Sequence, residues 1–296
     1  MKLDASTAAL LALPPLFWAG NAVAGRMLVG EVPPVALSLA RWVLAFALLL
    51  PFAWRGVVAH RAAFLRHWRI LLAISPLGVG AYNTLQYLAL QTSTPTSTSL
   101  IASSSPMFIL ALGALFFGER SRPMQWLGAA CSLAGVVTVM ARGDPANLAQ
   151  LRLVPGDLIM LAAVLAWTLY TWLLRRHRPE LPFAPLLLVQ IALGIAAIAP
   201  FALLEAQLSP ARIAWSGHVA VAMLYMAVFP SIAAYWCWDL GVRRVGAVIP
   251  VYFANLTPVF AALLSAWLLA DMPQPYHLAA LLLIIGGIHL ASRSAR

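Results

Sequence analysis

Uncharged stretches of about twenty apolar residues alternate with short polar breaks along the whole chain. The breaks hold charges or clusters of Pro, Gly and Ser, and the apolar runs show no alternation with a period of two. Runs of this length fit helices that cross a bilayer and satisfy their own backbone hydrogen bonds, whereas spanning strands alternate over about ten residues. The pattern therefore predicts an all-α integral membrane protein with ten transmembrane helices, at residues 8–29, 35–54, 69–90, 97–117, 124–141, 155–174, 184–204, 218–240, 246–269 and 276–292.

The composition excludes an ordinary soluble protein. The chain has 296 residues, of which 62% are hydrophobic and 9% are charged, whereas about a quarter of a soluble domain is charged. The first apolar run has no basic stretch before it and no small-residue cleavage site after it, so we expect it to be retained as a spanning helix. The net charge of +10 is attributed to basic cytoplasmic loops, and no nucleic-acid partner is expected.

The basic residues predict the orientation in the membrane. Lys2 and the segments that follow the second, fourth, sixth, eighth and tenth predicted helices together hold 14 of the 19 basic residues. Because Lys and Arg accumulate in cytoplasmic loops, both termini are predicted to be cytoplasmic.

Two halves of the chain repeat one pattern. At an offset of 149 residues Trp18 meets Trp167 and Arg41 meets Gln190, and at an offset of 152 Pro106 meets Pro258. These pairings predict two five-helix units, residues 1–145 and 146–296. Because each unit has an odd number of spans, the second is inverted relative to the first, which is typical of secondary transporters that work by alternating access.

Short motifs strengthen this interpretation. Pro106 is followed after twelve residues by Glu119-Arg120 and then by Gln-Trp-Leu-Gly at 125–128, and Pro258 is followed by Asp271 at the same spacing. With Trp18 and the duplication, the chain resembles the EamA-type ten-helix exporters of the drug/metabolite transporter superfamily.

The resemblance implies a cavity lined by helices 1, 3, 4, 6, 8 and 9, in a multi-pass protein of the bacterial inner membrane. It also implies export of amino acids, here aromatic or other amphipathic ones, and of related small metabolites. A broad-specificity exporter of drugs or toxic compounds is the alternative. The second copy departs from the motif, since Met272 stands where a basic residue would follow the acid.

Polar and aromatic side chains inside the apolar runs identify a candidate site, because such groups face the interior or a water-filled path. Hydrogen bonding or packing between helices is the competing interpretation for most of them. Trp18 and Trp167 stand at equivalent depth in the two units, so they are candidates for facing walls of one pocket. The predicted substrate-binding residues are Trp18, Asn21, Tyr82, Gln86, Ser103, Trp167, Tyr170, Thr171, Tyr235, Trp238, Tyr252 and Asn255.

Four residues are candidates for gating: Pro106, Pro258, Glu119 and Asp271. Pro106 removes the amide that would bond the carbonyl of Ala102 and so loosens its helix. Glu119 and Asp271 fall at helix ends, on opposite sides of the membrane by the predicted topology. Capping or ordinary ion pairing is the competing role for both acids.

Two further charged residues need separate interpretations. Arg41 lies six residues into its predicted helix, so it is expected to snorkel to the outer interface or to act as a scaffold, ahead of binding a substrate carboxylate. Asp239 and Arg243 are spaced i,i+4 and are expected to form a surface ion pair.

The sequence offers little for chemistry other than transport. No acid lies mid-membrane, and the six histidines lack metal-binding or nucleophile-activating spacing. We therefore expect no catalytic residue, metal or cofactor, and place an intramembrane enzyme or a channel behind a carrier. The expected partners are a small-molecule solute and the lipid bilayer, and the expected state is a monomer.

Overall fold

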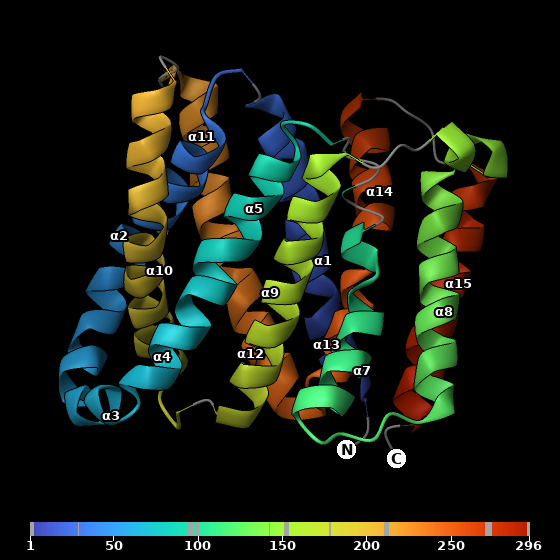
Figure 1. Ribbon diagram of the computed structural model, residues 1–296, viewed down its shortest axis with the longest axis horizontal. Helices are drawn as coiled ribbons and strands as arrows, with labels where there is room; N and C mark the ends of the chain where they lie inside the picture. Colours follow the sequence, from blue (N-terminus) through green and yellow to red (C-terminus); the bar gives the residue numbers. More distant parts are fainter. Residues whose placement is uncertain are drawn as a thin grey trace.

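The structure is a computed structural model in which the helices pack side by side as a bundle (Figure 1). It describes residues 3–28, 30–93, 98, 101–141, 143–150, 154–177, 179–209, 213–269 and 274–294. Every regular element in these ranges is helical, as predicted. Both ends of the chain lie at the same end of the bundle (Figure 1).

In the part of the chain that the structure describes, six helical segments are long and apolar enough to cross a membrane by length and composition. Each coincides with a predicted span; α1 begins three residues before its span and ends two residues short of it, and the other five reach beyond theirs by one to five residues at one or both ends. Five are single helices and the sixth combines two helices with the π-helical segment between them. The five are α1 (Ala5–Met27), α2 (Pro34–Ala59), α9 (Pro155–His177), α10 (Phe183–Leu208) and α15 (Pro275–Ser294); the sixth is α11 (Gly217–Met226), η3 (Ala227–Ala233) and α12 (Ala234–Val245).

The other four predicted spans are built from shorter or interrupted helices, so the count of ten remains a prediction. The span at 69–90 is divided into three elements, and the one at 246–269 is divided into two. These elements are α4 (Trp68–Ser75), η1 (Pro76–Ala81), α5 (Tyr82–Ala89), α7 (Ser105–Phe116), α8 (Pro123–Met140), α13 (Val248–Ala254) and α14 (Thr257–Leu269). Short connecting helices are α3 (Arg61–Arg66) and η2 (Pro145–Gln150).

Two π-helical segments interrupt corresponding spans of the two halves. η1 begins at Pro76, and η3 contains Pro230. Proline cannot donate to the preceding turn, and π turns within α-helices are frequent at functional sites. The sequence analysis did not predict these segments.

A break in the helix precedes both α7 and α14, and each of these helices has proline as its second residue, Pro106 and Pro258. Within the described chain, the hydroxyl of Ser105 donates to the carbonyl of Ala102, and the Thr257 hydroxyl donates to that of Ala254 at 2.7 Å. In each case the acceptor is the carbonyl that the next residue, proline, leaves without an amide donor. A side chain one residue before the proline therefore closes each break.

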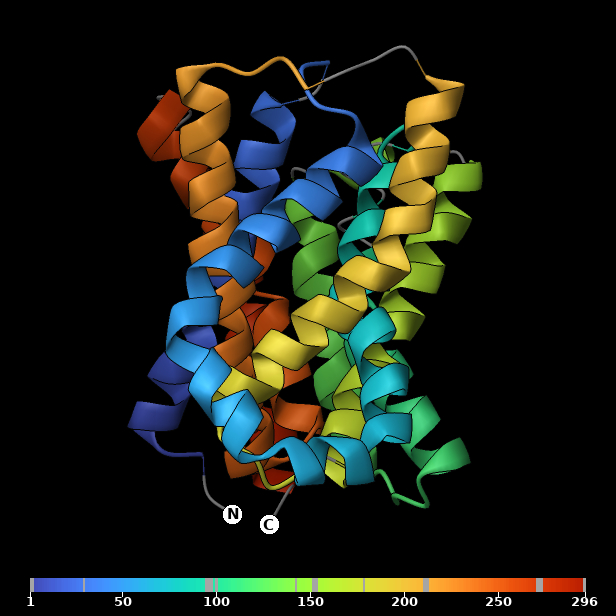
Figure 2. The ribbon, with the colours of Figure 1, turned by 90° about the vertical axis from the view of Figure 1, so that its left-hand side faces the viewer.

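Two helix pairs form much of the framework. α2 and α10 cross on the face shown in Figure 2. α8 packs along α15 at one side of the bundle (Figure 1). A Cβ on Gly128 would lie 2.7 Å from the Gly287 carbonyl oxygen, and one on Gly287 would lie 2.5 Å from that of Gly128. Glycine at both positions is what allows these two backbones to touch.

Candidate functional site

An aromatic cluster lies where helices from the two halves of the chain meet. Trp167 of α9 is at its centre and is only 6% exposed. Its ring meets that of Trp18 edge to face, at 5.4 Å and 89°, so the two tryptophans paired by the repeat are in contact. The rings whose centroids lie 5.1–5.6 Å from Trp167 are those of Trp18, Tyr82, Tyr170, Tyr235 and Trp238.

Two polar atoms of this cluster donate to the π-helical segments. The indole nitrogen of Trp18 donates to the Pro230 carbonyl of η3 at 3.3 Å. The Tyr235 hydroxyl donates to the Gly78 carbonyl of η1. A Cβ on Gly78 would lie 2.5 Å from the Tyr170 ring, so glycine is needed for this ring to approach the backbone. The irregular segments therefore supply both the acceptors and the space for the aromatic side chains.

Arg41 of α2 is surrounded by uncharged acceptors from three other elements. Its guanidinium Nη1 lies 3.0–3.2 Å from three oxygens, and Nη2 donates to the Ser231 hydroxyl at 2.8 Å. We call Arg41 and its four partners the arginine cage; the partners are Asn21, Asn83, Tyr87 and Ser231. The prediction that Arg41 snorkels is wrong, because the side chain is 1% exposed and directed at other helices. The scaffold alternative agrees with these contacts.

The arginine cage and the aromatic cluster are contiguous. Arg41 lies over the ring of the next residue, Trp42, at 4.9 Å, and that ring meets Tyr235 at 5.4 Å. On α1, Asn21 of the cage is one turn from Trp18 of the cluster. A polar, cationic compartment thus adjoins an aromatic one.

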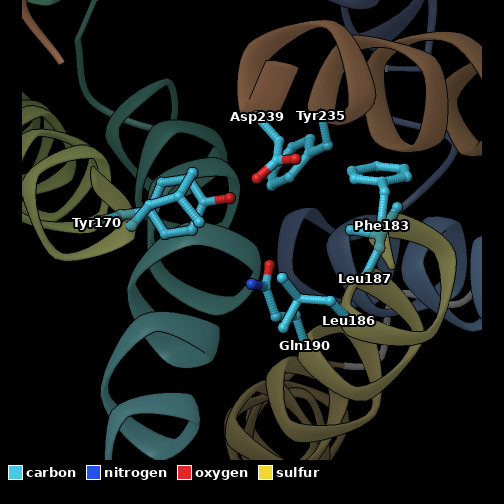
Figure 3. A pocket seen from close by; sticks show the side chains of 8 residues that line it. Tyr170, Phe183, Leu186, Leu187, Gln190, Tyr235 and Asp239 are labelled. Carbon is cyan, nitrogen blue, oxygen red and sulfur yellow. The ribbon is translucent and has the colours of Figure 1, made fainter. Parts of the chain in front are cut away.

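A small cavity is lined by Tyr170 and Tyr235 of the aromatic cluster (Figure 3). Its volume is about 10 Å³, roughly the room that one water molecule needs. Figure 3 shows Gln190 of α10 facing Tyr170, with Asp239 and Tyr235 of α12 beside them. Asp239 pairs with Arg243 at 3.2 Å. The predicted ion pair is present, but the acid is buried instead of lying at the surface.

A larger pocket opens at the end of the bundle where both termini lie. It has a volume of about 200 Å³ and is lined by Glu119, Trp172, Arg175 and Arg176. The Trp172 ring stacks on Phe117 at 5.2 Å. This pocket combines side chains of both charges with the aromatic ring of Trp172.

Comparison with known proteins identifies the fold. The EamA-like transporter family matches residues 5–141 and 154–293, nearly the whole chain. The chain belongs to the EamA-like transporter family. An "Uncharacterized transporter" of Archaeoglobus fulgidus is 26% identical over 98% of both chains. The "Aromatic amino acid exporter YddG" of Ancylobacter novellus is 27% identical over 95% of both chains. A solved crystal structure aligns with a TM-score of 0.78 over 99% of both chains, at 24% identity.

Some predicted site residues of this EamA-like transporter use their polar atoms in hydrogen bonds outside the ring contacts of the aromatic cluster. Tyr252 donates to the Gln125 carbonyl at 2.5 Å, and the Asn255 amide donates to the Ser132 hydroxyl at 2.8 Å, both on α8. Thr171 bonds the Trp167 carbonyl of its own helix at 2.9 Å. The structure thus places these side chains in contacts within or between helices.

Two other predicted residues border the site without a described role in it. Gln86 of α5 is half-buried, one turn beyond Tyr82, and Ser103 is buried before the break at Pro106. Their part in binding remains a prediction.

The predicted gating residues occupy different settings in this EamA-like transporter. Pro106 and Pro258 are buried at the two breaks. Glu119 is exposed and lines the pocket beside the arginines of α9. Asp271 lies outside the described residues. Their gating role remains a prediction.

Three of the four partners of Arg41 were not among the predicted site residues: Asn83, Tyr87 and Ser231. Asn83 and Tyr87 share a face of α5 at i,i+4. Both are buried against Arg41. The signal that could have found them is the arginine itself, because an intramembrane guanidinium needs several nearby acceptors.

Proposed function

We propose that this EamA-like transporter exports aromatic amino acids, or similar amphipathic metabolites, across the bacterial inner membrane by alternating access. The observation that carries the proposal is Trp167, which contacts aromatic rings from both halves of the chain. In this proposal the halves are two inverted five-helix units with both termini in the cytoplasm. A site between opposed units can open to either side as one unit rocks against the other.

The chemistry of the cluster favours a ligand with an apolar, planar body. Tryptophan and tyrosine rings attract another ring through offset or edge contacts worth about 0.5–1.5 kcal/mol each. In the collapsed cluster the rings make these contacts with one another. When an aromatic ligand enters, contacts between two protein rings are replaced by equivalent contacts between a protein ring and the ligand ring. The entry of the ligand therefore costs little free energy. The name of the Ancylobacter relative supports the same substrate class.

Counterflow in proteoliposomes tests the proposal. Purified protein is reconstituted with unlabelled phenylalanine inside, and uptake of labelled phenylalanine or tryptophan is followed with and without a pH gradient. Saturable counterflow is expected of a carrier. Flux that does not saturate would indicate a channel, and movement of hydrophobic cations alone would favour the drug-exporter alternative.

Replacing Trp167 by alanine tests the assignment of the cluster. We expect phenylalanine uptake to fall about tenfold or more, because one to two ring contacts correspond to about 1.4 kcal/mol. Trp236→Ala is the matched control, since Trp236 is half exposed on α12. Equal uptake by Trp167→Ala and the control, at equal protein levels, would show that the cluster is not the binding site.

A further inference from the structure

Arg41 carries a buried positive charge with no acidic partner among the described residues. Its four hydrogen-bond partners are two amide oxygens and two hydroxyls, all uncharged. Arginine does not lose its proton in proteins. A buried charge normally has a counterion, because its separation from water costs several kcal/mol. The arginine cage therefore orients the cation and leaves its charge in place.

The buried polar atoms that lack a partner in the described residues are all donors, and one of them belongs to Arg41 itself. Among the described buried side chains, the nitrogen and oxygen atoms without a hydrogen-bond partner are Arg41 Nε, Trp42 Nε1 and Trp238 Nε1. Buried donors are nearly always satisfied in native proteins. A group that fits here must bring acceptors and negative charge. A carboxylate does both, because its two oxygens accept about four hydrogen bonds and match a guanidinium in geometry.

The same structural elements supply both the cation and the rings. α1 contributes Asn21 and Trp18, α2 contributes Arg41 and Trp42, and α5 contributes Asn83 and Tyr82. In η3 the Ser231 hydroxyl bonds Arg41, while the carbonyl of the preceding residue bonds Trp18. The residues that bond Arg41 and those that belong to the aromatic cluster are neighbours along these elements. This spacing suits a ligand in which a short linker joins the ring to the acceptor group.

We propose that Arg41 binds the carboxylate of the transported molecule while the aromatic cluster holds its ring. The substrate class is then aromatic carboxylates, α-amino acids among them, in preference to the corresponding amides and amines. This inference rests on the proposed function and assigns the polar half of the same site.

A binding assay with matched acid and amide pairs tests this site directly. Thermal unfolding of the purified protein in detergent is measured against increasing 3-phenylpropionate or 3-phenylpropionamide, and against phenylalanine or phenylalaninamide. For the wild type, we expect each acid to bind at least tenfold more tightly than its amide. Equal binding of acid and amide would overturn the proposal.

Three variants separate charge recognition from a scaffold role. Arg41→Gln should bring the acid and amide affinities within twofold, and Arg41→Lys should retain part of the preference. Asn83→Asp places a carboxylate where the Asn83 oxygen lies 3.1 Å from Nη1. It should keep or raise the melting temperature and still lose the preference for acids. A pure scaffold would not lose that preference on gaining an ion pair.

The matched control is Arg66→Gln, the same substitution at an exposed position, which should keep the tenfold preference. Should Arg41→Gln fail to fold, Asn83→Asp decides the question. A tenfold acid preference that survives in Asn83→Asp overturns the proposal. Acid preference without counterflow refutes export of aromatic amino acids and leaves the carboxylate site standing. Counterflow without acid preference refutes the carboxylate site and leaves the export of aromatic amino acids standing.

Discussion

Replacing Thr257 by valine removes one hydroxyl from the break before Pro258 and keeps the branched side-chain shape. That hydroxyl donates to the Ala254 carbonyl at 2.7 Å, and the proline at position 258 provides no amide to replace it. The loss of a hydrogen bond costs about 1 kcal/mol, and an unsatisfied buried carbonyl costs about 1–3 kcal/mol. Because Ala254 and Thr257 are only half-buried, we expect a loss of about 1–2 kcal/mol.

The measurement is the free energy of unfolding in detergent micelles, with Thr138→Val as the matched control. Thr138 also donates from its hydroxyl, to the Ala134 carbonyl at 2.8 Å. Ala134 lies in uninterrupted α8, where the backbone amide four residues on bonds the same carbonyl. Its hydroxyl is therefore redundant, and the control should change stability by about 0.5 kcal/mol or less. If both valine variants lose the same free energy, the break does not depend on its hydroxyl and the reasoning fails.

Three further changes are expected to lower thermal stability, each checked by the melting temperature of the purified protein. The carboxylate of Glu205 accepts hydrogen bonds from the first two amides of α2, at 2.8 and 2.9 Å. Glu205→Gln weakens this cap and should cost about 1 kcal/mol. Gly287→Val forces α15 away from the Gly128 carbonyl and should cost about 2–3 kcal/mol; an unchanged melting temperature would contradict the close backbone contact. Asn255→Leu removes the bond to Ser132 and should cost about 1–2 kcal/mol, whereas a gain in stability would mean that this bond is dispensable.

The sequence predicted the all-helical fold, and it placed Trp18 and Trp167 at equivalent depth. Both follow from local information, because apolar run length identifies the helices and the repeat places equivalent residues at equal depth. It also predicted that Pro106 frees the Ala102 carbonyl. It could not predict that Ser105 takes up that carbonyl, because the hydroxyl has several acceptors within reach of its own helix.

The arginine cage could not be predicted because its members come from distant parts of the chain. Ser231 is 190 residues from Arg41, and Asn21 is 20 residues from it. Helical spacing identifies residues that share one face, but it does not say which helix that face meets. The same gap explains Tyr252 and Asn255, which are positioned on α13 and at its end and contact α8. Contacts between helices depend on how the helices pack, and helical periodicity carries no information about that packing.

The π-helical winding of η3 has a consequence for the alternating access proposed above. Straightening a π turn into a regular α turn shifts the following residues by one register position and rotates them by about 100°. Ser231 and Tyr235 would then leave Arg41 and Trp167 in a single motion. A solute that binds more tightly to the π-helical form of η3 than to the α-helical form, or the reverse, would shift the population between the two conformers. It would do so without any contact outside the bilayer.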